Sequence, residues 1–181
     1  MIRIAITGPE CSGKTKLAHW LATKIFDARY VTEYAREYLE GKKSGYVYNS
    51  NDLVHVAREH ATRLKKAFRS SSDALICDTE FYTLDIWWRE KIGGINAEFQ
   101  EYKITFDFDL FLLCTPDIPW VQDGLRENPD DRDRLFEMYQ TALKEDNRNY
   151  LVVSGNGEER MSEILQKILH RFPNLMLKEE D

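Results

Sequence analysis

The sequence lacks a long hydrophobic run, an excess of basic residues and a framework of cysteines. No apolar stretch in its 181 residues approaches the roughly 18 to 20 residues that a membrane-spanning helix needs. The net charge of −6 disfavours a nucleic-acid-binding surface, which is normally strongly basic. Cys11, Cys77 and Cys114 lie far apart and lack metal-ligand spacing. We therefore expect a cytoplasmic protein that acts on a small molecule and binds neither membranes nor nucleic acids.

What the sequence does contain is enough apolar material for one substantial core. Hydrophobic residues make up 43% of the chain and aromatic residues 12%, and a chain of this length falls within the usual size of one domain. No repeat, low-complexity tract or linker interrupts it. We expect a single domain over residues 1–181, and the possibility of a homo-oligomer stays open.

Short apolar runs alternate with helical patterns along the chain. Strands are expected at 2–6, 30–32, 74–77, 109–114 and 150–153, with helices between them. A long helix that ends near Phe68 can be capped by Asn51 or Asp52. This alternation predicts an α/β fold with a doubly wound, mostly parallel five-stranded sheet, helices on both faces, and ligands at the carboxyl ends of the strands.

A phosphate-binding loop follows the first expected strand. The pattern G-x-x-x-x-G-K-[ST] is matched at every defined position, with a helical pattern behind it. In such a P-loop the backbone amides surround the phosphates, the lysine reaches the β- and γ-phosphates, and the hydroxyl helps to hold Mg²⁺. The sequence thus predicts binding of ATP and Mg²⁺ by Gly8, Pro9, Glu10, Cys11, Ser12, Gly13, Lys14 and Thr15.

An acid stands at the carboxyl end of the third expected strand. Asp78 ends the buried run 74–77, where it can serve Mg²⁺ together with Thr15 or accept the proton of an acceptor hydroxyl. Helix capping is the alternative role for this aspartate, because a helix begins soon after it. Glu80 can face the same cleft or act as a first-turn acid that the helix dipole favours.

A second acidic segment follows the second expected strand. P-loop kinases tend to place the acceptor there, so Glu33 and Tyr34 are predicted to contact the substrate. Glu33 can bind a ribose hydroxyl or act as general base, and the sequence does not decide whether Glu33 or Asp78 takes the proton.

A polar, arginine-bearing segment at about 116–134 has the composition of a helical lid. Its arginines, Arg126, Arg132 and Arg134, suit the neutralisation of charge on a transferring phosphoryl group, and Arg126 and Arg132 are predicted to bind ATP. Trp87, Trp88 and Trp120 follow expected strand ends, where a flat cationic substrate can stack; Trp88 and Trp120 are the predicted contacts.

The pieces GPECSGKT, TEYAREY, CDTEF and PWVQDGLR, in this order, resemble the nicotinamide riboside kinase domain of the NadR family, a P-loop domain of the AAA-type ATPase-like kind. The resemblance implies ATP-dependent phosphorylation of the 5′-hydroxyl of nicotinamide riboside, which gives nicotinamide mononucleotide for NAD synthesis. It implies that Lys14, Asp78, Glu33 and Arg126 are catalytic. It also implies a nucleoside site lined by Glu33, Tyr34, Glu80 and Trp120.

Two departures from the family pattern limit what the resemblance implies. This chain has Glu80 where many relatives have aspartate, and a longer polar stretch between Gly41 and Asn51. The DNA-binding region and adenylyltransferase domain of longer family members are not expected within these residues. The alternatives are a kinase for another nucleoside or nucleotide, and a regulatory ATPase or nucleotide switch, although no guanine-specificity motif of the Asn-Lys-x-Asp kind is present.

Overall fold

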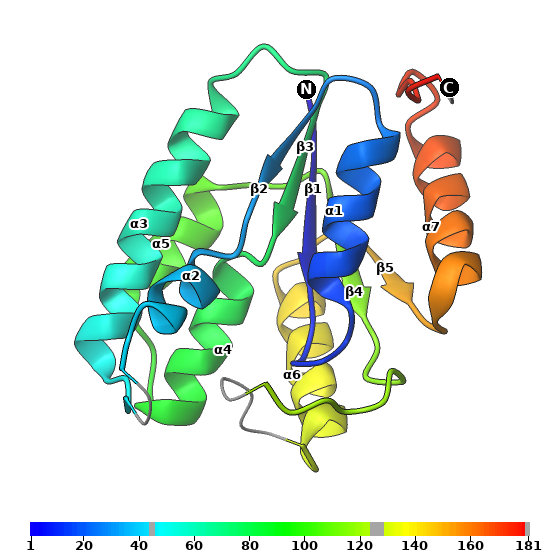
Figure 1. Ribbon diagram of the computed structural model, residues 1–181. Coiled ribbons are helices and arrows are strands. Elements are labelled where there is room, and N and C mark those ends of the chain that lie inside the picture. Colours follow the sequence, from blue (N-terminus) through cyan, green and yellow to red (C-terminus); the bar gives the residue numbers. More distant parts are fainter. Residues whose placement is uncertain (44–45, 124–128, 180–181) are drawn as a thin grey trace.

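A five-stranded sheet forms the centre of the protein (Figure 1). The computed structural model describes residues 1–43, 46–123 and 129–179. The strand order is β2-β3-β1-β4-β5, and each neighbouring pair is parallel. The predicted parallel α/β sheet is therefore confirmed. Its strands are β1 (Ile2–Thr7), β2 (Ala28–Val31), β3 (Ala74–Asp78), β4 (Leu110–Cys114) and β5 (Tyr150–Val153).

Helices cover both faces of the sheet. Alternate residues of β1 point to opposite sides, so Ile4 and Ile6 pack with α1 and α7, whereas Ala5 joins a cluster formed with α3, α4 and α6. No helix among the described residues is long and apolar enough to cross a membrane. The helices are α1 (Lys14–Lys24), α2 (Tyr34–Glu40), α3 (Ser50–Phe68), α4 (Phe81–Lys91), α5 (Ala97–Thr105), α6 (Arg132–Glu145) and α7 (Gly157–Arg171).

The central strands place the P-loop beside the predicted acid. Every residue of β3 and β4 is buried, as expected of parallel strands that are covered on both faces. Because β1 lies between these strands, Ile6 pairs in register with Asp78. The end of β1 and the end of β3 thus meet at the same edge of the sheet, where the structure positions the candidate site.

The start of α3 differs from the sequence-based expectation. The N-cap is Asn49, not Asn51 or Asp52. The Asn49 side chain accepts a hydrogen bond from the Asn51 amide, and Asp52 accepts one from the Asn49 amide at 2.8 Å. Asp52 is therefore the third residue of a reciprocal capping box, which satisfies the first amides of the helix from both sides.

The predicted lid is helical only where α6 begins. Residues 116–123 and 129–131 contain no helix, and α6 starts at Arg132. Pro116, Pro119 and Pro129 explain the difference, because each removes a backbone donor that a helix would need. Arg126, a predicted catalytic and ATP-binding residue, lies outside the described residues, so its role stays a prediction.

Candidate active site

Two glycines let the loop between β1 and α1 lie close to the neighbouring chain. Gly8 has φ +130°, and a Cβ on it would lie 2.6 Å from the Cys114 carbonyl oxygen. Gly13 has φ +78°, and a Cβ there would lie 2.7 Å from Cδ1 of Ile118. Gly8 therefore requires glycine for backbone conformation and for space, whereas Gly13 requires it for backbone conformation, because the end of the Ile118 side chain can move aside.

Polar contacts hold the loop from the inside and the outside. The Ser12 hydroxyl and the Lys14 ammonium both donate to the Pro9 carbonyl oxygen, at 2.7 and 2.8 Å. From outside, Arg132 donates to the carbonyl oxygens of Cys11 and Ile118, at 3.3 and 2.8 Å. Arg132 thus contacts the back of the P-loop, and its guanidinium lies 5.7 Å from the ring centre of Trp120.

Cys11 anchors the loop to the segment that follows β4. Its thiol donates to the Pro119 carbonyl oxygen at 3.3 Å, and its sulfur accepts a hydrogen bond from the Val121 amide at 3.3 Å. Cys11 has φ +53°, which is uncommon for a residue with a side chain. The two contacts offset this strain and give Cys11 a structural role in the loop.

Asp78 lies behind the loop and is almost fully buried. Its Oδ2 accepts a hydrogen bond from the Tyr30 hydroxyl at 3.4 Å, the Thr15 hydroxyl lies near the same carboxylate, and its Oδ1 has no hydrogen-bond partner. Burial raises the pKa of Asp78, while the Thr15 hydroxyl and the Lys14 charge oppose this shift. A cation bound beside this buried carboxylate would stabilise its charged form.

The residues present fit a magnesium ion that is carried by substrate phosphates. Mg²⁺ usually binds one or two protein oxygens and completes its shell with phosphate and water. The Thr15 hydroxyl and the unpartnered Oδ1 of Asp78 offer such oxygens side by side. Within the described residues no group of three or more His, Cys, Asp or Glu side chains could hold a metal by itself.

Glu33 approaches the loop from the opposite side. It is the N-cap residue of α2, its side chain is 13% exposed, and it forms a 3.8 Å ion pair with Arg36. Burial raises the pKa of Glu33, the Lys14 ammonium lowers it, and the Asp78 carboxylate raises it further. Arg36 also donates to Asp123 at 3.1 Å, which links α2 to the segment after β4.

A cavity of about 530 Å³ lies between these groups. Its volume falls within the range of small-molecule sites. One part, the phosphate half, is lined by Gly8 and residues 10–15. The other part, the acceptor half, is lined by Lys16, His19, Tyr30, Glu33, Arg36, Leu39, Thr83 and Trp87.

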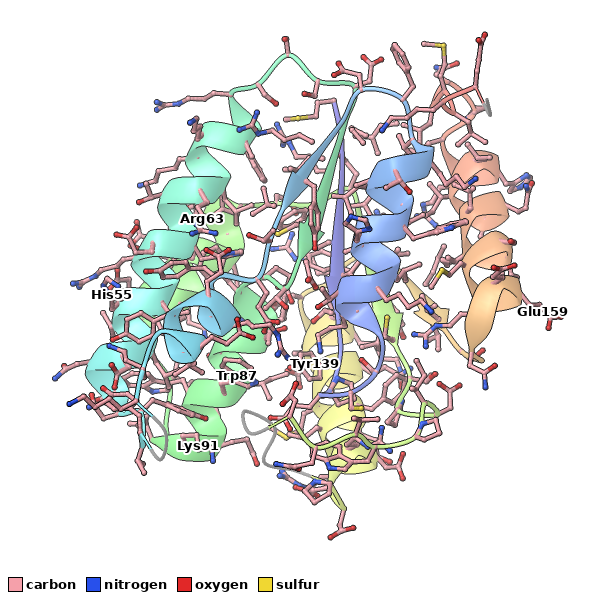
Figure 2. All side chains as sticks on the ribbon, viewed as in Figure 1. His55, Arg63, Trp87, Lys91, Tyr139 and Glu159 are labelled. Atoms are coloured by element: carbon pink, nitrogen blue, oxygen red, sulfur yellow. The ribbon has the colours of Figure 1, made fainter. Side chains whose placement is uncertain are left out.

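Trp87 is the tryptophan that lines this cavity. Figure 2 shows Trp87 and Tyr139 at the carboxyl end of the sheet, where they project from α4 and α6. A second cavity of about 20 Å³ shares Glu10 and Trp87 with the first and is also lined by Pro9 and Tyr139. The indole of Trp87 therefore forms a wall between two adjoining spaces.

Several predicted contacts lie outside the main cavity. Trp88 packs edge-on against Phe99 at 5.5 Å. Tyr34 faces α3, where its hydroxyl lies 3.3 Å from His55 and the Arg63 guanidinium stacks on its ring. Trp120 donates from its indole to Gln122. None of these three lines the cavity.

Glu80 also takes a different position from the one predicted. It is the N-cap residue of α4, where its Oε2 accepts a hydrogen bond from the Tyr82 amide at 2.6 Å. The side chain is 1% exposed and does not line the cavity. Burial raises its pKa to about 7. Glu80 therefore neither faces the cleft nor lies in the first turn, the two roles that the sequence suggested, but caps the helix just before that turn.

Sequence reasoning did not single out Thr83, and it named Trp87 as a residue that could stack on a substrate but chose Trp88 and Trp120 as the contacts. Thr83 and Trp87 lie four apart on α4, so they occupy one face of the helix. The sequence signal that could have identified them is this four-residue spacing in the helix that follows Asp78. Tyr30 was likewise missed, although it precedes Glu33 by three residues and donates to Asp78.

Comparison with known proteins connects this site to a family. A family model described as an AAA domain matches residues 3–160. The trifunctional NAD biosynthesis/regulator protein NadR from Salmonella typhimurium is 31% identical over 156 residues, and NadR from Escherichia coli is 30% identical over 154 residues. Each match covers 83% of this chain and 37% of the relative. The chain therefore spans well under half the length of these relatives.

Solved structures show the same fold. A NadR protein in complex with NR superposes with a TM-score of 0.81 at 18% identity, over 99% of this chain and 54% of that chain. Thymidylate kinase from Candida albicans gives 0.65 at 14% identity, over 99% and 96% of the two chains. Deoxyadenosine kinase from M. mycoides gives 0.63 at 14% identity, over 93% and 100%. The fold is that of the P-loop kinases.

Proposed function

Because this chain belongs to the AAA-domain family and is homologous to NadR, we propose that it is an ATP-dependent kinase acting on nicotinamide riboside. The reaction transfers the γ-phosphoryl group of ATP to the 5′-hydroxyl of the riboside and gives nicotinamide mononucleotide and ADP. The homologous NadR proteins take part in NAD biosynthesis, and a NadR structure of the same fold binds NR. We further propose that residues 1–181 act as one kinase domain.

The observation that carries this proposal is the single cavity that joins the two halves. It begins at the P-loop and reaches Glu33 and Trp87 without interruption. The nicotinamide ring of the riboside is flat and cationic, so the face of Trp87 can attract it. The carboxylates of Glu10 and Glu33 favour the same positive charge.

The residues of the chain divide the chemistry between them. The P-loop amides and Lys14 bind the phosphates, and Glu33 accepts the proton of the attacking 5′-hydroxyl, because it lines the cavity whereas Asp78 lies behind it. Asp78 lies near the Thr15 hydroxyl, so the two can act together. Mg²⁺, when bound by Thr15 and Asp78, supplies charge neutralisation on the β- and γ-phosphates.

The test is a substrate panel with ATP consumption and monophosphate formation measured together. We expect nicotinamide riboside to be phosphorylated at a rate above that of adenosine, cytidine and thymidine. If another nucleoside turns over and nicotinamide riboside is inert, the acceptor assignment is wrong. ATP hydrolysis without any phosphorylated acceptor would instead favour a nucleotide switch.

A second candidate acceptor is a nucleoside monophosphate, and the cations of the acceptor half favour it. Lys16 and Arg36 line this part of the cavity, where an anionic substrate would gain from their charge. The panel therefore includes thymidine, adenosine and cytidine monophosphates. Formation of a diphosphate would identify this reaction.

A further inference from the structure

A buried arginine reaches the P-loop from α7. Arg160 lies in the first turn of that helix and is 5% exposed. One of its terminal nitrogens donates to the Ser12 carbonyl oxygen at 2.9 Å, and the other donates to the Gly155 carbonyl oxygen at 3.2 Å. Arg160 thus connects the P-loop to the turn that follows β5.

No ion pair with another described residue balances the charge of this arginine. Its described partners are carbonyl oxygens, its Nε has no hydrogen-bond partner, and no carboxylate of the described residues forms an ion pair with it. A buried cation of this kind is normally paired with an anion. The guanidinium lies directly behind Gly13, since its terminal nitrogen is 3.5 Å from where a Cβ on Gly13 would be.

The hydrogen bond to Ser12 fixes the orientation of one P-loop peptide. A trans peptide unit is planar, so the Gly13 amide points away from the Ser12 carbonyl oxygen. No peptide bond in the described chain is cis. With the carbonyl directed at Arg160, the amide is directed to the other side of the loop.

We propose that Arg160 is a positioning residue for the triphosphate: it orients the Ser12-Gly13 peptide, and its uncompensated charge is balanced when phosphates bind on the other side of the loop. This inference rests on the proposed ATP binding and assigns a role to a residue outside the P-loop motif. It also explains why a cation is buried here without a carboxylate, because a nearby acid would cancel the field at the phosphates.

The experiment compares Arg160→Met with the wild-type protein by calorimetric titration. The two titrants are ATP with Mg²⁺ and inorganic tripolyphosphate with Mg²⁺, and the thermal unfolding of the free protein is measured in parallel. We expect both ligands to bind about tenfold more weakly to the variant, because a hydrogen bond from a charged group and a nearby charge are both lost. Arg160→Lys retains the charge and is expected to recover part of the affinity.

The matched control is Arg171→Gln, which removes an exposed arginine from the far end of the same helix. Its affinities are expected to equal those of the wild type. Equal ATP affinity in wild type and Arg160→Met would overturn the inference, as would weaker binding of ATP with unchanged binding of tripolyphosphate. If Arg160→Met does not fold, Arg160→Lys decides: recovery of the fold with wild-type affinity overturns the inference, and a weaker affinity for both ligands supports it. Wild-type protein that binds no ATP would overturn the proposed function itself.

Discussion

The phosphate half of the cavity comes from one stretch of chain, whereas the acceptor half is assembled from four separate elements. Gly8 and residues 10–15 are continuous in the sequence, and internal hydrogen bonds to Pro9 hold them. The acceptor half combines residues from α1, β2, α2 and α4. The difference teaches that the phosphate-binding loop is encoded locally here, while the choice of the proposed acceptor depends on how distant helices pack.

Removal of the P-loop lysine should abolish the function of the phosphate half and leave the other half unchanged. Lys14→Ala is expected to lower kcat by roughly a thousandfold, because the charge that stabilises the transferring phosphoryl group is lost. Steady-state kinetics give kcat, and circular dichroism checks the fold. Binding of nicotinamide riboside alone, measured by calorimetry, should stay within twofold of wild type; a parallel loss would show that the halves are not separable.

Loss of the proposed base should slow the chemical step and leave ATP binding unchanged. Glu33→Gln is expected to lower kcat by about a hundredfold, while ATP affinity remains, because proton transfer alone is affected. Since burial raises the pKa of Glu33, wild-type kcat/KM should fall as the pH drops through a value above the usual range of a glutamate.

The pH profile distinguishes Glu33 from Asp78. If Glu33 is the base, Glu33→Gln removes the acidic limb of the kcat/KM profile. An acidic limb that persists unchanged in Glu33→Gln would assign the proton to another group, and Asp78→Asn would then be the variant to compare.

Two adjacent tryptophans offer a smaller and more selective test. Trp87→Ala is expected to raise the KM for the acceptor about tenfold, because Trp87 lines the cavity and can stack on the substrate ring. Trp88→Ala is the matched control: Trp88 packs on Phe99 outside the cavity, so its loss should lower the free energy of unfolding by about 2 kcal/mol. Acceptor KM and chemical unfolding are measured for both. An equal rise in acceptor KM in the two variants would contradict the proposal that Trp87 contacts the substrate and Trp88 does not.

The smallest expected effect concerns a buried histidine, His60, which packs in the core outside the cavity. His60 on α3 is buried against Cys77 and Phe81, and this burial lowers its pKa from 6.5 to about 4. Between pH 6.5 and about pH 4, the His60 imidazole binds a proton in the unfolded protein but not in the folded one. The stability that depends on neutral His60 is therefore fully present above pH 6.5 and is lost as the pH falls. Between pH 7 and 5.5 the loss should be about 1 kcal/mol.

Urea unfolding at both pH values, with His60→Gln beside the wild type, isolates this contribution from those of other titrating groups. The variant should lose less stability on acidification than the wild type. An identical loss in both proteins would mean that His60 does not resist protonation in the folded state.

The sequence predicted the parts of the site that depend on local pattern. Gly8, Gly13 and Lys14 follow from a motif whose spacing is fixed by the backbone, and Asp78 follows from its place after a buried strand. The remaining assignments required the rotation of a helix or the packing of distant segments. Trp87 and Trp88 are neighbours that point in different directions, and sequence alone does not give that rotation. Arg160 lies far from Ser12 in the sequence, so no local signal pairs them.

The central position of β1 has a consequence for how the protein acquires its activity. β1 pairs with β3 and β4, which are distant in sequence, and the P-loop rests against the end of β4 through Gly8. Such non-local parallel pairings form slowly, because a long stretch of chain must be closed before they contribute. The edge of the sheet that carries the nucleotide site is therefore complete only after these pairings have formed. ATP should bind the native state alone and act as a folding ligand that raises the melting temperature in proportion to the logarithm of its concentration.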